Sequence, residues 1–339
     1  MGEIYRNQTD MPKDEHRISV QLYYGFGNGK DFFIAGHVLK SRSSRSFRPS
    51  RNLFRHSYRM ARMYLGKPHP NHKISLLFEG IQMEVQADED GYFQCVGKTV
   101  NRISTGWRPV FVNQTSQPDS AEKIPAGWVF IPQESPFLIV SDVDDTVLIS
   151  HSLRFRKRMR ELILKNTYKR RLFAEATELY GFLEDFLTLP GQRNPVFYVS
   201  ASEWNLFPYL REIFEKNGLP KGPILLHPRK HWSDLWGGKK TLPMDKQGRI
   251  ERLMTFFPDR KVILLGDNSQ QDPIIYQNLS EKEPERIAGV FIRLVSEKKV
   301  ETTRHVLQKL SELGIPNGLF VHSPDAIDQI RQSLKPTRH

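Results

Sequence analysis

The chain has 339 residues, 38% of them hydrophobic and 11% aromatic, which is enough for two globular domains that each bury a core. No apolar run approaches the roughly 20 residues of a transmembrane helix, and the polar residues 1–17 lack the apolar core of a secretory signal, so a cytoplasmic protein is expected. Because Cys95 is the single cysteine, an intrachain disulfide and a zinc site built from several thiolates are excluded. Cys95 is predicted to be a small buried side chain.

The net charge of +12 is concentrated in one part of the chain. Ten lysines and arginines and no acidic residue occur between Asp31 and Glu79. Such a patch indicates a polyanionic partner, for which nucleic acid and an anionic lipid surface both remain open.

After the polar tail, residues 18–135 are predicted to form a small β-rich domain, antiparallel and β-sandwich-like. Short β-type runs separated by turns cover residues 18–24, 32–40, 73–78, 81–86 and 92–96. Residues 51–65 carry an arginine stripe beside an apolar stripe, which predicts an inserted amphipathic basic helix. The polar stretch after Asn113, up to Glu122, is predicted to be a linker or a long loop.

Residues 136–335 are predicted to form an α/β domain. Continuous apolar runs at 137–140, 196–199, 262–265 and 287–295 alternate with segments of helical length. This pattern is typical of a parallel sheet sandwiched by helices. Ligands of such sheets bind beyond the carboxyl ends of the strands, so the chemistry is expected there.

The first strand of this half ends in a cluster of acids, Asp142, Asp144 and Asp145, followed by Thr146. Closely spaced carboxylates repel one another unless a cation or a proton is shared between them. A hard divalent ion with oxygen ligands satisfies them. The alternative is a solvated turn that caps the next helix.

Two other strand ends and a lysine belong with this cluster. Asp267 and Asp272 follow the strand 262–265, with Gly266 allowing a tight turn. Ser200 ends the strand 196–199, where a hydroxyl and backbone N–H groups could hold a phosphoryl oxygen; alternatively Ser202 or Asn205 caps the following helix. Lys246 could offset the charge of phosphate and aspartate, and otherwise it is a surface lysine.

In order, these motifs resemble the four motifs of haloacid-dehalogenase-like (HAD-like) phosphatases. The longer segments 141–147, 198–208 and 266–276 resemble the actin-patch-associated phosphatidate phosphatase family and its bacterial relatives. The likeness covers about residues 136–295, and residues 24–27 and 36–39 resemble the domain that precedes it in bacterial members. The sequence departs from the family at Glu203 and at Asp245, and Lys239 and Lys240 remain alternatives to Lys246.

The resemblance implies a HAD-like fold for residues 136–335 and a phosphohydrolase that forms an aspartyl-phosphate. Asp142 would be the nucleophile and Asp144 the general acid and base, with Ser200 and Lys246 holding the phosphoryl oxygens. The implied cofactor is Mg²⁺. Its ligands would be Asp142, the backbone of Asp144, Asp267 and Asp272. Expected substrate-binding residues are Thr146, Ala201, Ser202, Trp204 and Asn205.

The resemblance implies phosphatidate as the substrate, with diacylglycerol and phosphate as products. The segment 151–172 holds nine lysines and arginines against one acid, which suits peripheral association with an anionic membrane or a solvated helix packed on the core. A soluble phosphate monoester is the alternative substrate. A third hypothesis is a nucleic-acid-binding protein with an inactive phosphatase domain. No nucleic-acid partner is expected, because the sequence contains no nucleic-acid recognition motif.

Overall fold

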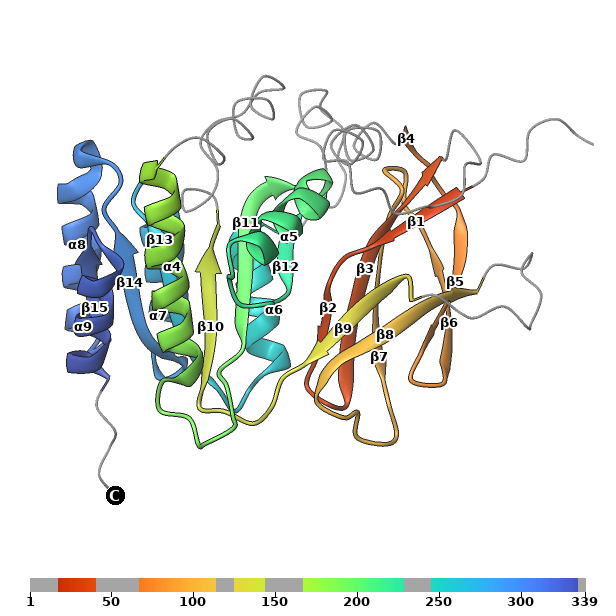
Figure 1. Cartoon of the computed structure of the whole chain (residues 1–339), viewed down its shortest axis with the longest axis horizontal. Helices are drawn as coiled ribbons and strands as arrows, with labels where there is room; N and C mark the ends of the chain where they lie inside the picture. The colour runs from red at the N-terminus through yellow and green to blue at the C-terminus, as the bar shows by residue number, and fades with distance from the viewer. Residues whose placement is uncertain (1–17, 41–66, 114–124, 144–166, 229–244, 335–339) are drawn as a thin grey trace, which may run out of the picture.

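A computed structural model describes residues 18–40, 67–113, 125–143, 167–228 and 245–334. They form a β-rich domain beside an α/β domain (Figure 1). The predicted tail (1–17), the basic helix (51–65), the polar stretch that follows Asn113 and the first part of the basic segment (151–166) lie outside these residues.

The β-rich domain contains more strands than the sequence pattern predicts. The strands are β1 (Ile18–Leu22), β2 (Gly25–Gly27), β3 (Asp31–Lys40), β4 (Lys67–Pro68), β5 (Lys73–Phe78), β6 (Ile81–Gln86), β7 (Tyr92–Lys98), β8 (Gly106–Asn113) and β9 (Gly127–Ile131). The five predicted runs correspond to β1, β3, β5, β6 and β7. The strands β2 and β4 are too short for a periodic pattern, and β8 and β9 lie on either side of the stretch predicted to be a linker or a long loop.

The strand order of this domain is β1-β3-β2-β9-β8-β5-β6, with β4 and β7 also paired to β3. The expected antiparallel arrangement holds except between β2 and β9, which run parallel. The strand β9 lies between β8, with which it pairs antiparallel, and the three-residue strand β2, with which it pairs parallel. The interior is apolar and includes Phe32, Ile34, Leu76 and Phe78.

The second domain alternates strands and helices as predicted. Its elements are β10 (Phe137–Asp142), α4 (Thr167–Asp185), β11 (Val196–Glu203), α5 (Phe207–Lys216), β12 (Ile224–His227), α6 (Lys246–Phe256), β13 (Lys261–Asp267), α7 (Asp272–Lys282), β14 (Ile287–Arg293), α8 (Val300–Glu312), β15 (Asn317–Phe320) and α9 (Ser323–Ser333). The four predicted strands are β10, β11, β13 and β14. The strands β12 and β15, of four residues each, were not predicted.

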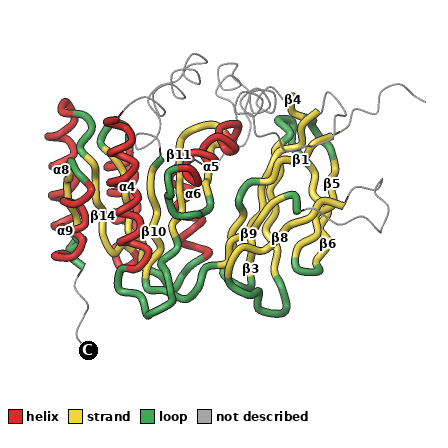
Figure 2. Tube along the Cα trace, viewed as in Figure 1, coloured by secondary structure: helices red, strands yellow, loops and turns green. Residues whose placement is uncertain are grey.

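All strand pairs of the second sheet are parallel, in the order β12-β11-β10-β13-β14-β15. Helices α4, α5 and α9 share a core with one face of the sheet. Helices α6, α7 and α8 pack on the other face. Figure 2 shows the helices flanking the strands, so the predicted sandwich of a parallel sheet between helices is confirmed.

The two domains share part of one hydrophobic core. Phe26 of β2 is fully buried, and its ring lies 5.6 Å from that of Phe197 and 5.0 Å from that of Phe256. Phe33 and Ala35 of β3 belong to the same buried cluster as the side chains of α6. The β-rich domain therefore packs directly on the α/β domain.

Among the described residues, no helix is both long and apolar enough to cross a membrane.

Candidate functional site

The order of the parallel strands creates a switch point between β10 and β13. From β10 the chain proceeds outward through β11 and β12, then returns to β13 and proceeds outward the other way through β14 and β15. The connections that leave β10 and β13 therefore diverge. In open α/β sheets, ligands bind in the crevice that such a divergence leaves at the carboxyl ends of the strands.

Three aspartates meet at this switch point. Asp142 is the last residue of β10, Asp267 the last residue of β13, and Asp272 the first residue of α7. Each contributes a carboxylate oxygen to a group whose members lie within 4.8 Å of one another, and all three side chains are buried. The fold thus gathers acids that are up to 130 residues apart in the sequence.

Gly266 makes this close approach possible. A Cβ atom at this position would lie 2.6 Å from Asp272 Oδ2 and 2.8 Å from Tyr276 Cε2. Without a side chain here, α7 begins directly against the end of β13, and the Asp267 N–H donates to Asp272 Oδ2 at 3.4 Å. Glycine is therefore needed at position 266 to allow close packing, and not because the backbone adopts an unusual φ angle there.

Lys246, the first residue of α6, is the cation of the cluster. Its Nζ lies 2.6 Å from Asp142 Oδ1 and also forms an ion pair with Asp272. Burial lowers the pKa of Lys246, but the carboxylates of Asp142 and Asp272 outweigh burial and hold it above its usual value. The lysine therefore stays charged and neutralises part of the acidic site.

The neighbouring titratable groups respond to the same environment. Burial raises the pKa of Asp272, with Asp267 adding to the effect and Lys246 opposing it. Burial also raises the pKa of Tyr276, and the carboxylates of Asp272, Asp142 and Asp267 contribute. Its hydroxyl donates to the Leu265 carbonyl at 2.8 Å, which ties α7 to β13 beneath the aspartates.

The local sequence explains how α6 places its lysine. Asp245 is the N-cap residue, and its side chain accepts a hydrogen bond from the Gly248 N–H at 2.7 Å. The departure from the family at Asp245 thus supplies a good helix cap. The cap fixes the first turn of α6, from which Lys246 reaches the acids.

Ser200 lies beside this cluster, on the strand next to β10. Val199 pairs with Asp142 across the two strands, so the serine follows at the carboxyl edge. Ser200 is fully buried, and its Oγ accepts from the Ser202 N–H at 2.9 Å. The Arg249 guanidinium donates to the Ser200 carbonyl at 3.0 Å.

Arg249 is a component of the site that sequence reasoning missed. It is buried and lies three residues after Lys246, so both side chains project from the same face of α6. The basic spacing of Lys246 and Arg249 is the signal that could have identified it.

The remaining predicted residues of the serine segment have different surroundings. Ala201 is exposed, Ser202 and Asn205 are half-buried, and the Asn205 amide donates to Glu203 Oε2 at 3.3 Å. Trp204 is buried, and its ring stacks on His37 with the centroids 3.9 Å apart.

The alternative in which Ser202 or Asn205 caps the following helix is wrong. A 3-10 turn, Trp204–Leu206, comes first, and the N-cap of α5 is Leu206 without a side-chain hydrogen bond. Asp144, Asp145, Thr146, Lys239 and Lys240 lie outside the described residues, and the roles predicted for them stay predictions.

The described part of the site fits a hard divalent cation. Three buried carboxylates have converging oxygens, and Lys246 is paired with two of them, Asp142 and Asp272. Oxygen-only ligands of this kind suit Mg²⁺ better than softer metals.

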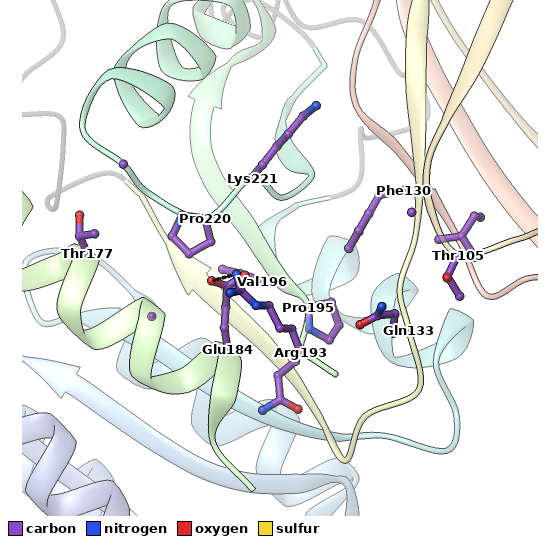
Figure 3. Close-up of a pocket in the computed structure, with 15 residues that line it drawn as sticks. Thr105, Phe130, Gln133, Thr177, Glu184, Arg193, Pro195, Val196, Pro220 and Lys221 are labelled. Carbon is purple, nitrogen blue, oxygen red and sulfur yellow. Dashed lines mark hydrogen bonds and ion pairs between the residues drawn. The ribbon is translucent and has the colours of Figure 1, made fainter. Parts of the chain in front are cut away.

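A cavity of about 530 Å³ lies elsewhere, at the opposite ends of the strands. Figure 3 shows Glu184 and Arg193 beside Pro195 at the start of β11, with Phe130 and Gln133 of the β-rich domain across the space. Burial raises the pKa of Glu184, while the Arg193 guanidinium opposes that effect. The lining contains none of the three aspartates, so this cavity is separate from the acidic site.

Fold and site together define a doubly wound α/β protein with a buried acidic cluster at its switch point. Residues 137–294 match the family described as the catalytic domain of phosphatidate phosphatase APP1. The resemblance to the phosphatidate phosphatase family that the sequence motifs indicated is confirmed for this part of the chain.

Two curated proteins are similar to the chain. One is an uncharacterized protein of Schizosaccharomyces pombe, 28% identical over 182 residues that make up 53% of this chain and 29% of that protein. The other is phosphatidate phosphatase APP1 of Saccharomyces cerevisiae, 24% identical over 196 residues, or 57% of this chain and 31% of that protein. The chain thus spans about a third of the length of either relative.

Among solved structures, a carbohydrate acetylesterase from Xanthomonas citri aligns over 94% of this chain and 75% of its own, at 12% identity and a TM-score of 0.31. A similarity this low carries no information about function.

Proposed function

We propose that the protein is a Mg²⁺-dependent phosphatidate phosphatase with a HAD-like catalytic domain, acting through an aspartyl-phosphate. The observation that carries the proposal is the contact of Lys246 with Asp142 and Asp272, inside a buried group of three aspartates. The match of residues 137–294 to the APP1 catalytic domain supports the reaction type. A buried carboxylate cluster paired with a lysine at the ligand-binding edge also argues against an inactive domain.

In the first step, a carboxylate oxygen of Asp142 attacks phosphorus and the bond from phosphorus to the ester oxygen breaks. Asp144 gives its proton to the departing alkoxide, which leaves as the alcohol, diacylglycerol. Covalent catalysis of this kind divides one difficult displacement into two easier ones. Lys246 stabilises the carboxylate form of Asp142, which is the form that attacks.

In the second step, water attacks the phosphorus of the aspartyl-phosphate. Asp144, now ionised, accepts the proton from the water, and the bond from phosphorus to Asp142 breaks. Phosphate leaves, and both aspartates return to their starting states. Lys246 and Ser200, with the backbone N–H groups next to Ser200, would hold the phosphoryl oxygens, where negative charge accumulates.

Asp142, Asp267 and Asp272 would hold the Mg²⁺ ion, with the backbone carbonyl of Asp144. When bound, the ion supplies positive charge that offsets the repulsion between the phosphate and the carboxylates.

A lipid substrate is supported by the surface around the site. Three large aliphatic side chains are exposed, each between 46% and 49%: Ile274 in the first turn of α7, Val295 after β14 and Val321 after β15. They follow the carboxyl ends of their strands, at the same edge of the sheet as the aspartates, and the exposed Lys298 and Lys299 follow Val295. Aliphatic side chains with adjacent lysines suit peripheral contact with an anionic membrane.

The experiment that tests the proposed function is phosphate release, with Mg²⁺, from phosphatidate in anionic vesicles and from a panel of soluble phosphate monoesters. We expect a preference for phosphatidate, loss of activity on chelation, and at least a 1,000-fold loss in Asp142→Asn, the order seen when a nucleophile is removed. Asp259→Asn, an exposed acid at the opposite edge, serves as the control and should keep full activity.

Two outcomes would change the proposal in different ways. Near-normal turnover in Asp142→Asn would end the mechanism. Activity confined to soluble esters would keep the mechanism and replace the lipid by a soluble substrate. The triple variant Ile274→Ser, Val295→Ser, Val321→Ser should lose activity on vesicles and keep it on soluble esters, whereas Leu189→Ser, 66% exposed at the opposite edge, should change neither.

A further inference from the structure

Residues 200–204, at the end of β11 and called the serine turn below, are in direct contact with the β-rich domain. Trp204 lies four residues after Ser200 and is 2% exposed. Its ring stacks on that of His37 with an interplanar angle of 15°. His37 belongs to β3, in the other domain, and it is fully buried.

His37 is itself fixed by its own domain. The hydroxyl of Tyr23 lies 2.5 Å from His37 Nδ1 in a hydrogen bond. The rings of Tyr23 and Tyr92 lie 5.8 Å and 5.3 Å from the imidazole. Tyr23 also packs on Phe207, the first residue of α5, at 5.2 Å, so the contact continues beyond Trp204.

The segment between Ser200 and Trp204 is not a regular strand. The pairing of β11 with β12 shifts register between Val199 and Glu203. An irregular strand end has fewer ladder hydrogen bonds to define its path, so side-chain contacts at its two ends take over that role. Arg249 holds the end at Ser200, and His37 holds the end at Trp204.

We propose that His37 is a positioning residue for the serine turn, acting through its stack on Trp204, so that the β-rich domain is a structural part of the active site. The inference rests on the proposed function for its kinetic consequence. The positioning itself has a separate readout, the local stability of the turn.

The test compares His37→Ala with His69→Ala, a histidine of the same domain that packs on His72 in the turn between β4 and β5. Amide hydrogen exchange of residues 200–205 should be at least about tenfold faster in His37→Ala and unchanged in His69→Ala. Exchange around Asp267 should match the parent protein in both. Unchanged exchange at 200–205 in folded His37→Ala would overturn the proposal, whatever the activity of the protein.

The kinetic arm uses p-nitrophenyl phosphate with Mg²⁺ and inhibition by inorganic phosphate. Displacement of a binding group can cost on the order of 100-fold in rate, so we expect kcat/KM to fall about 10- to 100-fold in His37→Ala, with weaker inhibition by phosphate. His37→Phe retains a ring against Trp204 and should recover most of the loss. Equal losses in His37→Phe and His37→Ala would show that stacking is not the mechanism.

Tyr23→Phe is a milder variant for the case in which His37→Ala does not fold. It removes only the hydroxyl that orients His37. It should show the same changes as His37→Ala to a smaller extent, and parental exchange and kinetics in this variant would contradict the proposed support of His37. If the parent protein does not hydrolyse or bind phosphate, the proposed function fails, while the exchange experiment still decides whether His37 positions the turn.

Discussion

Lys246 is the residue on which the charge balance of the site depends. It is 7% exposed and neutralises two carboxylates that are each almost fully buried. A buried ion pair is costly to break from one side, because the partner is left charged and unpaired. The same side chain therefore serves stability as well as the proposed chemistry.

We expect Lys246→Met to lower the free energy of unfolding by about 3 kcal/mol, the cost of leaving a buried charge without its partner. Urea unfolding at pH 7 and low ionic strength measures the change. Asp272→Asn added to Lys246→Met should recover a large part of the loss, since one of the stranded charges is removed. A loss below about 0.5 kcal/mol in the single variant would mean that water replaces the lysine.

Cys95 gives a second prediction at this scale. The thiol is half-buried on β7, and burial raises its pKa from 9.0 to about 11, against a smaller opposing effect of a backbone hydrogen bond with Ile34. At pH 8 the reactive thiolate is therefore about 100-fold scarcer in the folded protein than in the unfolded chain. Because the folded pKa is the higher one, raising the pH from 9 to 11 also favours unfolding.

Alkylation with iodoacetamide measures this effect. We expect the rate at pH 8 to be about 100-fold lower than in denaturant, and to rise about tenfold per pH unit up to pH 10. Labelling of the native protein at the rate of the unfolded one would show that the thiol is not protected.

The residues of the site were predictable where a motif marks them. Asp142 and Asp267 end strands, Lys246 and Asp272 begin helices, and Ser200 lies near the end of β11; the structure gathers them at one edge of the sheet. Arg249 and His37 were not predicted. For Arg249 the spacing from Lys246 was a signal, but its role became evident only from its hydrogen bond to the Ser200 carbonyl. His37 makes its contact across a domain boundary that no local pattern reveals.

At the scale of elements, length decided which strands could be predicted. The strand β10 is a continuous apolar run that is buried on both faces, so its sequence is distinctive. The strands β2, β12 and β15 have three or four residues, and their pairing is set by neighbours already in place. The parallel pairing of β2 with β9 also depends on tertiary structure, since these strands are about 100 residues apart.

Two glycines in different elements provide a matched prediction. Gly266 ends β13 where a methyl group would meet Asp272 and Tyr276, whereas a methyl group at Gly181, inside α4, meets nothing within 4 Å. We expect Gly266→Ala to lower stability by about 1–3 kcal/mol, as overpacking does, and activity by about 100-fold. Gly181→Ala should raise stability by about 1 kcal/mol, because alanine is the better helix former.

Thermal unfolding and phosphatase assays on both variants measure these effects. A Gly266→Ala variant with parental activity would mean that α7 can move away from β13 without disturbing Asp272. A destabilised Gly181→Ala would mean that the surface of α4 is more crowded than its surroundings indicate.

The whole molecule is organised around the contact between its two domains. Phe26 and Phe33 of the β-rich domain lie in the same buried cluster as Ile250 and Leu253 of α6. The stack of His37 on Trp204 adds a second contact near the catalytic edge. Composition and periodicity indicated two domains, but they could not indicate a shared core. The apolar pattern of a strand shows that one face is buried, and it does not show which other element covers that face.

A shared core predicts that the domains unfold together. Phe78→Ala removes a ring that is 1% exposed inside the β-rich domain, next to Phe32, and should cost about 3–5 kcal/mol. Although Phe78 belongs to the separate core of the β-rich domain, we expect the loss to lower the unfolding midpoint of both domains equally. Tryptophan fluorescence, to which Trp107 and Trp128 of the β-rich domain contribute, and far-ultraviolet circular dichroism, which reports on the helices, should give coincident transitions.

Phe26→Ala is the companion variant, because it removes a ring from the interface itself. Loss of this contact should weaken the coupling, so that the fluorescence and dichroism transitions separate. If the helices of Phe78→Ala instead keep the parental midpoint while the fluorescence transition shifts, the domains are independent units. The contact between them would then be too weak for the β-rich domain to hold the serine turn in place.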